Sequence, residues 1–157
     1  SRVIVADIVQ KRLEKALELG ADFVVNAAQA DTVEEILKYT SGRGAELTIE
    51  TAGTETTTTQ AIHLSRKGAV VVLVGYGKSG MMNLPVSLAI DKELTFKTVF
   101  RYRHVYPVAI EAVAAGKVNL KGIVTNLFHF DDIQNAMDAS AHNKSEIVKS
   151  AVRIASV

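Results

Sequence analysis

The sequence has 157 residues, enough for one domain or for most of one with an appendage. Hydrophobic residues make up 48% of it and charged residues 22%, which favours a packed core over disorder. The formal net charge is +1 without a dense basic patch, so we do not expect a nucleic acid partner. Cysteine is absent, which excludes disulfides, thiolate metal ligands and a cysteine nucleophile within these residues and suits a cytoplasmic protein. No apolar run is long enough to span a bilayer, so we expect no membrane partner.

Short β-branched runs alternate with helical periodicity over the first 75 residues. The chain begins inside the first of these runs and without methionine, so we expect it to be truncated. Four strands are predicted, at residues 3–6, 23–25, 46–50 and 69–74. Helices are predicted between them: one carrying Leu13, Ala16 and Leu17 and ending at Gly20, one opened by a Thr32/Glu35 capping box, and one over residues 56–65. Apolar strands separated by helices predict an α/β fold with a doubly wound parallel sheet.

The alternation changes after Gly75. Pro85 indicates an extended segment, a strand is predicted over residues 94–99, and Pro107 suits the first turn of a helix that Gly116 ends. A strand over 124–130, a helix from 131 or 132 to 141 and a strand over 147–154 complete the chain. The different pattern of the tail predicts two domains, residues 1–99 and residues 100–157.

Ligands of doubly wound sheets bind beyond the carboxyl ends of the strands, which makes each strand end a candidate site. Asp7 follows the first predicted strand directly, where its carboxylate can accept hydrogen bonds from both hydroxyls of an adenosine ribose. It would repel a 2′-phosphate, which favours NAD over NADP. The alternative is that Asp7 caps the next helix. Arg12 lies five residues further on, within the first turn of the next helix, and can cover an adenine face or remain a solvated helix residue.

Two further strand ends and one side-chain cluster are candidates. The segments 50–53 and 74–77 run into glycines, which permit close approach to a ligand but also serve any tight turn. Residues 100–106 gather aromatic and cationic side chains, which suit a polar active site, a surface loop or, less well, single-stranded nucleic acid. The four histidines are scattered without ligand spacing, so no metal is assigned to this chain.

Several stretches resemble the zinc-containing medium-chain dehydrogenases, most closely the sorbitol/xylitol (polyol) dehydrogenase branch. Phe100-Arg101-Tyr102 points to polyol dehydrogenases, whereas the Asp7 and 67–75 stretches are shared across the superfamily. The similarity covers essentially the whole chain. The matching stretches are residues 3–7, 11–16, 19–22, 42–46, 67–75, 100–102, 106–107, 116–118 and 123–125.

The resemblance implies an oxidoreductase in which zinc polarises a secondary alcohol while hydride passes to NAD. It also implies a small-molecule polyol substrate and a homo-oligomer, dimer or tetramer. Arg101 and Tyr102 would act near the zinc-bound water or substrate. The residues implied at the cofactor are Asp7 at the ribose, Arg12 at adenine, and Val74, Gly75, Val99, Phe100 and Arg101 near the nicotinamide.

The chain lacks two features that the family resemblance leads one to expect. The glycine-rich turn that seats the pyrophosphate is absent with its strand and helix, and so are the cysteine, histidine and glutamate ligands of zinc. The chain therefore resembles a C-terminal half, with an incomplete Rossmann domain at 1–99 and part of the catalytic domain at 100–157. Alone it is expected to be inactive.

Three other interpretations remain open at this point. The parent can be a threonine or simple alcohol dehydrogenase of the same class. The fragment itself can be a non-catalytic nucleotide-binding or dimerisation module, since residues 70–74 and 83–90 are apolar enough to pair with a second copy. A methyltransferase also places an acid beside a ribose, but it leaves Phe100-Arg101-Tyr102 without a role.

Overall fold

The computed structural model describes residues 2–77, 80–143 and 145–155, so Ser1, where the expected truncation lies, falls outside the described residues. Its contacts divide the chain into two compact units. One unit joins the residues up to Gln29 with those from His104 onward, and the other is Ala30–Arg103. One unit limit thus lies near the predicted boundary at residues 99 and 100, and the assignment of the two domains stays a prediction.

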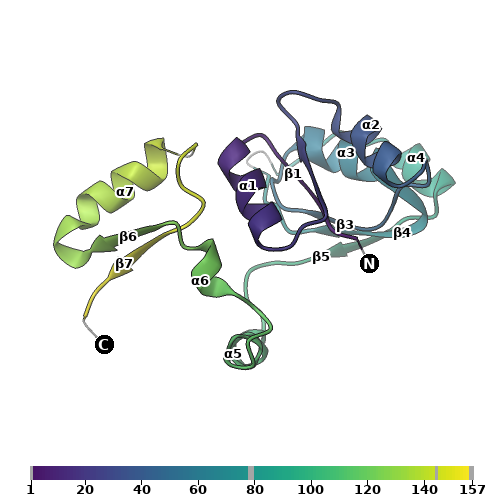
Figure 1. The fold of residues 1–157 in the computed structure, drawn as a ribbon. Coiled ribbons are helices and arrows are strands. Elements are labelled where there is room, and N and C mark those ends of the chain that lie inside the picture. Colours follow the sequence, from purple (N-terminus) through teal and green to yellow (C-terminus); the bar gives the residue numbers. More distant parts are fainter. Residues whose placement is uncertain (1, 78–79, 144, 156–157) are drawn as a thin grey trace. The chain divides into compact units, whose positions relative to one another are not determined.

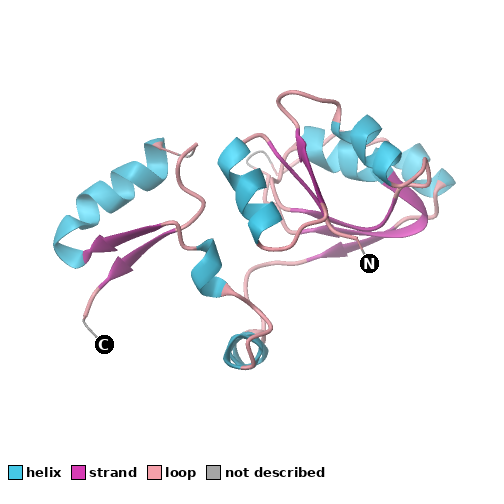
Figure 2. Ribbon diagram, viewed as in Figure 1, coloured by secondary structure: helices cyan, strands magenta, loops and turns pink. Residues whose placement is uncertain are grey.

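The unit Ala30–Arg103 is built on a sheet of three parallel strands in the order β3-β4-β5 (Figure 1). The helices of this unit lie on one face of that sheet (Figure 2). The elements are α2 Thr32–Tyr39, β3 Ala45–Glu50, α3 Glu55–Leu64, β4 Ser65–Leu73, α4 Val86–Asp91 and β5 Thr95–Thr98.

Helix α3 covers the buried face of this sheet. Ala69 and Val71 of β4 point to this face and are 1% and 0% exposed. Val71 is paired with Thr48 of β3 and with Phe96 of β5. The residues that alternate with these along the strands point to the opposite face, where Leu47 and Ile49 are more than half exposed. The apolar run of β4 therefore has one covered face and one open face in this unit.

The other unit contains two separate parallel pairs, β1 with β2 and β6 with β7. Helix α1 packs on β1 and β2 through Leu13, which is 1% exposed. The elements are β1 Ile4–Asp7, α1 Gln10–Glu18, β2 Phe23–Asn26, α5 Tyr106–Ala114, α6 Leu120–Ile123, β6 Asn126–His129, η1 Phe130–Asp132, α7 Ile133–His142 and β7 Ser150–Arg153.

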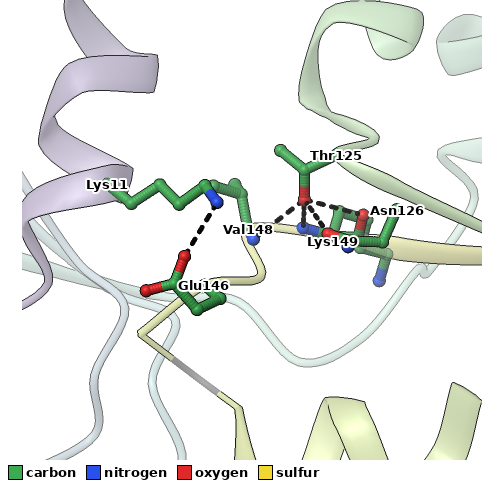
Figure 3. A network of polar contacts seen from close by, with 6 residues as sticks. All are labelled: Lys11, Thr125, Asn126, Glu146, Val148 and Lys149. Atoms are coloured by element: carbon green, nitrogen blue, oxygen red, sulfur yellow. Dashed lines mark hydrogen bonds and ion pairs between the residues drawn. The ribbon is translucent and has the colours of Figure 1, made fainter. Parts of the chain in front are cut away.

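Polar contacts around Thr125 fix the approach to β6 and β7 (Figure 3). The Thr125 hydroxyl donates to Oδ1 of Asn126 at 2.7 Å and accepts from the backbone N–H of Val148 at 3.1 Å. Figure 3 also shows an exposed ion pair, in which Nζ of Lys11 lies 3.1 Å from Oε2 of Glu146. Such an exposed pair contributes little to stability.

The predicted α/β class is confirmed, because all strand pairs of the described residues are parallel and helices connect them. The predicted helix ends at Gly20 and Gly116 are confirmed by positive φ angles of 101° and 69°. All the predicted strands are present, with boundaries that differ by a few residues.

The predicted Thr32/Glu35 capping box is wrong. Asp31 is the N-cap of α2, and its side chain accepts from the backbone N–H of Glu34. Thr32 instead lies inside the first turn, and its buried Oγ1 has no hydrogen-bond partner among the described residues. Aspartate and threonine are both favoured N-cap residues, and the glutamate three residues after Thr32 drew the prediction to Thr32 in place of the adjacent Asp31.

Helix α3 continues into β4 without a connecting loop. Leu64 ends the helix and Ser65 begins the strand. The Ser65 hydroxyl donates to the carbonyl of Ala61 and lies 3.0 Å from the hydroxyl of Thr48. Nζ of Lys92 donates to the carbonyls of Ile62, His63 and Ser65, which satisfies acceptors that the end of a helix leaves open.

Candidate functional site

Asp7 is the last residue of β1, at the carboxyl end of a parallel pair. Its Oδ1 accepts from the backbone N–H of Val9 at 2.9 Å, and Val9 is the N-cap of α1. The carboxylate thus helps to begin the helix, as the helix-cap alternative predicts. Its side chain is still 27% exposed, and among the described residues Oδ2 accepts only from Nη1 of Arg12, at 3.4 Å. Oδ2 is therefore the carboxylate oxygen that a ligand would share with Arg12.

Arg12 lies in the first turn of α1 and turns back toward the strand end. Its Nη1 is 3.4 Å from Oδ2 of Asp7, and its side chain is 37% exposed. The structure therefore brings together the two residues that the sequence predicts at the adenosine side of a dinucleotide. A planar cation beside an accessible carboxylate can bind a ribose and the base attached to it.

The carboxyl ends of β3, β4 and β5 meet at one edge of their sheet. The backbone N–H groups of Val74 and Gly75 donate to the carbonyl of Glu50, at 2.8 and 3.0 Å. The N–H of Val99 donates to the carbonyl of Leu73 at 3.0 Å. Val74 and Val99 are 41% and 47% exposed, so the edge presents apolar side chains that a flat ring can contact.

Two glycines pack against one another at this edge. A Cβ on Gly53 would lie 2.6 Å from the backbone nitrogen of Tyr76. A Cβ on Gly75 would overlap the backbone of Gly53 and lie 2.7 Å from Oε2 of Glu50. Gly53 also has a φ of 68°, which disfavours other residues. The turns that follow β3 and β4 are therefore interlocked through backbone atoms.

Phe100 and Arg101 continue the chain from the end of β5. The guanidinium carbon of Arg101 lies 5.1 Å from the centre of the Phe100 ring, within the range of a cation–π contact. The rings of Phe100 and Tyr76 are 6.2 Å apart. Both rings are largely exposed, as is Tyr102 at 65%. The cluster therefore presents aromatic faces and a cation at the same strand edge as Val74 and Val99.

The predicted site residues fall into two groups. Asp7 and Arg12 form one group at the end of β1, and their roles stay predictions. Val74, Gly75, Val99, Phe100 and Arg101 form the other group at the edge of the β3-β4-β5 sheet. The sequence did not predict Tyr76 as a partner of Phe100, although its place one residue after Gly75 was a usable signal.

The described residues do not supply a zinc site. No group of three or more histidine, aspartate or glutamate side chains in residues 2–77, 80–143 and 145–155 lies close enough to hold a metal ion. No helix in the described part of the chain has the length and apolarity needed to cross a membrane.

Comparison with known proteins identifies the family. The profile of the zinc-binding dehydrogenase family matches residues 1–115, which is well over half of the chain. The chain belongs to the zinc-binding dehydrogenases. The family match includes both groups of site residues, since each lies within residues 7–101.

Individual relatives within the zinc-binding dehydrogenases agree with this assignment. The chain is 37% identical over 156 residues to an uncharacterised zinc-type alcohol dehydrogenase-like protein, YdjJ of Escherichia coli. The aligned residues cover 98% of this chain and 44% of that protein. It is 37% identical over 143 residues to the sorbitol dehydrogenase of Ovis aries, with 89% and 40% covered.

A solved structure of an E. coli alcohol dehydrogenase in complex with NADH superposes with a TM-score of 0.88 at 26% identity, covering 98% of this chain and 45% of that one. The chain therefore spans less than half the length of the relatives it matches.

Proposed function

We propose that the protein containing this chain is an NAD-linked dehydrogenase that oxidises a secondary hydroxyl of a polyol. The observation that carries the proposal is the pair formed by Asp7 and Arg12 at the carboxyl end of β1. Similarity to sorbitol dehydrogenases supports a polyol as the substrate, and similarity to an NADH complex supports NAD as the cofactor.

Asp7 would bind the adenosine ribose through Oδ2. Carboxylate oxygens accept hydrogen bonds from both ribose hydroxyls, whereas a 2′-phosphate would meet like charge at the same position. Oδ1 would continue to accept from Val9 and keep the carboxylate oriented. Arg12 would then lie beside the adenine ring, with its guanidinium already held near Asp7.

The second group of residues would receive the nicotinamide half of the cofactor. Val74 and Val99 offer exposed apolar contacts, and Gly75 packs on the backbone of Gly53 at a position that has no room for a side chain. NAD, when bound, accepts the hydride that the alcohol carbon loses. Arg101 and Tyr102 would orient the substrate hydroxyl, and Phe100 would hold the Arg101 guanidinium in place by stacking.

Zinc would have to be held by residues outside this chain, since the described residues do not fit a zinc site. What these residues contribute is binding and orientation of the cofactor, and placement of a cation beside the reacting alcohol.

The test is a binding and activity comparison on the full-length protein. Calorimetry with NADH and NADPH should show binding of NADH and much weaker binding of NADPH. Assays with sorbitol, xylitol, threonine and ethanol should show oxidation of the polyols. Oxidation of threonine or ethanol alone would assign another substrate class, and absence of NADH binding by the intact protein would contradict the proposal.

A further inference from the structure

Glu50 is a buried acid in a position that the proposed function does not use. It ends β3 and is 5% exposed. Within the described part of the chain, it is the single acidic or basic residue that is buried. A buried carboxylate is costly unless hydrogen bonds compensate it. Its contacts therefore indicate what it is retained for.

Three donors converge on one oxygen of this carboxylate. Oε1 accepts from the backbone N–H groups of Ala52 and Gly53, at 2.8 and 2.9 Å, and from the hydroxyl of Thr57 at 2.7 Å. The first two donors belong to the turn after β3, and Thr57 belongs to the first turn of α3. The side chain thus fixes the path of the chain from strand to helix.

The same residue also holds the end of the neighbouring strand. Its carbonyl accepts from the N–H groups of Val74 and Gly75. Its Oε2 occupies space that a side chain at Gly75 would need. Gly75 in turn packs on the backbone of Gly53, which Glu50 anchors. Glu50 therefore sets the separation of the two strand-end turns.

We propose that Glu50 is a positioning residue that holds Val74 and Gly75 where they receive the nicotinamide half of the cofactor. This inference rests on the proposed function. Glu50 acts through Gly53 and Gly75 and does not itself touch the cofactor. Because Asp7 and Arg12 bind the other half, loss of the Glu50 contacts should affect nicotinamide binding and spare adenosine binding.

The experiment compares NADH with ADP-ribose, a probe that lacks the nicotinamide, by calorimetry on full-length wild type, Glu50→Ala and Glu50→Gln. In Glu50→Ala we expect NADH affinity to fall by about tenfold or more, which corresponds to ~1.4 kcal/mol, while ADP-ribose affinity stays within about threefold. Glutamine keeps an oxygen acceptor for Ala52, Gly53 and Thr57, so Glu50→Gln should restore NADH affinity to within about threefold of wild type.

Two variants complete the design. Glu46→Gln changes an exposed acid on the same strand, whose partner is Arg66, and should leave both affinities unchanged. If Glu50→Ala does not fold, Thr57→Val removes one donor from Oε1 and should weaken NADH binding selectively by a smaller factor.

Equal loss of NADH and ADP-ribose affinity in Glu50→Ala would overturn the proposal, as would wild-type NADH affinity in that variant or, where it does not fold, in Thr57→Val. Failure of the wild type to bind either probe is a different result, because it would reject the proposed function and with it this inference.

Discussion

Arg12 places its Nη1 atom 3.4 Å from Oδ2 of Asp7, where β1 gives way to α1. Both side chains remain partly exposed, at 37% and 27%. The pair is thus open to water and to a ligand at once. In such a setting the ion pair itself contributes only about 0–1 kcal/mol to folding. The arrangement is better suited to binding than to stability.

The substitution Asp7→Asn separates these two effects. Asparagine keeps an oxygen that can accept from the N–H of Val9, so α1 should still begin normally. We expect the free energy of unfolding to change by less than about 1 kcal/mol and NADH affinity to fall by about tenfold, with NADPH affected less. Calorimetry and urea unfolding measure both quantities. Unchanged preference for NADH over NADPH would contradict the ribose role.

Arg101 should contribute to turnover. Its guanidinium stacks on Phe100, and its backbone has a φ of 55°, an uncommon value for a residue other than glycine. In Arg101→Ala of the full-length protein, we expect kcat for polyol oxidation to fall by about tenfold or more, with a smaller effect on stability. Lysine should rescue poorly because it lacks a planar fork.

Steady-state kinetics on Arg101→Ala, Arg101→Lys and Arg66→Ala test this role. Arg66 is an exposed arginine that pairs with Glu46, so its removal controls for loss of charge alone. Wild-type kinetics in Arg101→Ala would remove Arg101 from the substrate site.

Gly53 should not tolerate a side chain. A Cβ there meets the backbone of Tyr76 at 2.6 Å and must also adopt a positive φ. We expect Gly53→Ala to reduce the free energy of unfolding by about 2–5 kcal/mol. Gly68 is a matched control, because its φ is 70° but nothing lies within 4 Å of a Cβ. Gly68→Ala should cost only about 1–2 kcal/mol, and equal effects would contradict the proposed backbone contact.

Lys92 should stabilise the end of α3. Its ammonium donates to three carbonyls at the junction with β4. Lys92→Met removes these bonds, so we expect a loss of about 1–3 kcal/mol in the free energy of unfolding, measured with urea. Lys97→Met, at an exposed position of β5, should have little effect. A loss of the same size in both variants would argue against a specific cap.

The titration of Lys92 gives a separate prediction. Burial lowers the pKa of Lys92 from its ordinary value of 10.5. Between the lowered folded pKa and 10.5 the unfolded chain holds more protons than the folded one. The stability difference between wild type and Lys92→Met should therefore increase as the pH rises through that window. Unfolding curves at a series of alkaline pH values check the direction, and a decrease would contradict it.

The sequence predicted the strand ends because apolar β-branched runs stop at recognisable residues. Asp7 follows such a run, and the structure places it as the last residue of β1. The sequence did not predict α4, because Pro85 indicated an extended segment and the helix that follows it is short. Hydrophobic patterns predict long helices and strands better than they predict the conformation of a short segment next to a proline.

The role of Glu50 could not be predicted from the sequence. The sequence shows an acid at the end of a strand, but the three donors to its carboxylate come from Ala52, Gly53 and Thr57. Its carbonyl accepts from the N–H groups of the two residues that directly follow β4. Only the folded chain brings these groups together. The same holds for Tyr76, whose ring meets Phe100 through the pairing of β4 with β5.

The direct passage from α3 into β4 makes the length of this segment as important as its composition. With no loop between Leu64 and Ser65, one inserted residue would have to enter either the helix or the strand. Inside the regular ladder from Val70 to Leu73 it would exchange the two faces of the strand, turning Val71 out and its neighbours in. Protein engineers who wish to vary chain length in this domain should therefore leave residues 70–73 unchanged and work at residues 41–43, keeping Gly44, where a Cβ would lie 2.6 Å from the carbonyl oxygen of Leu64.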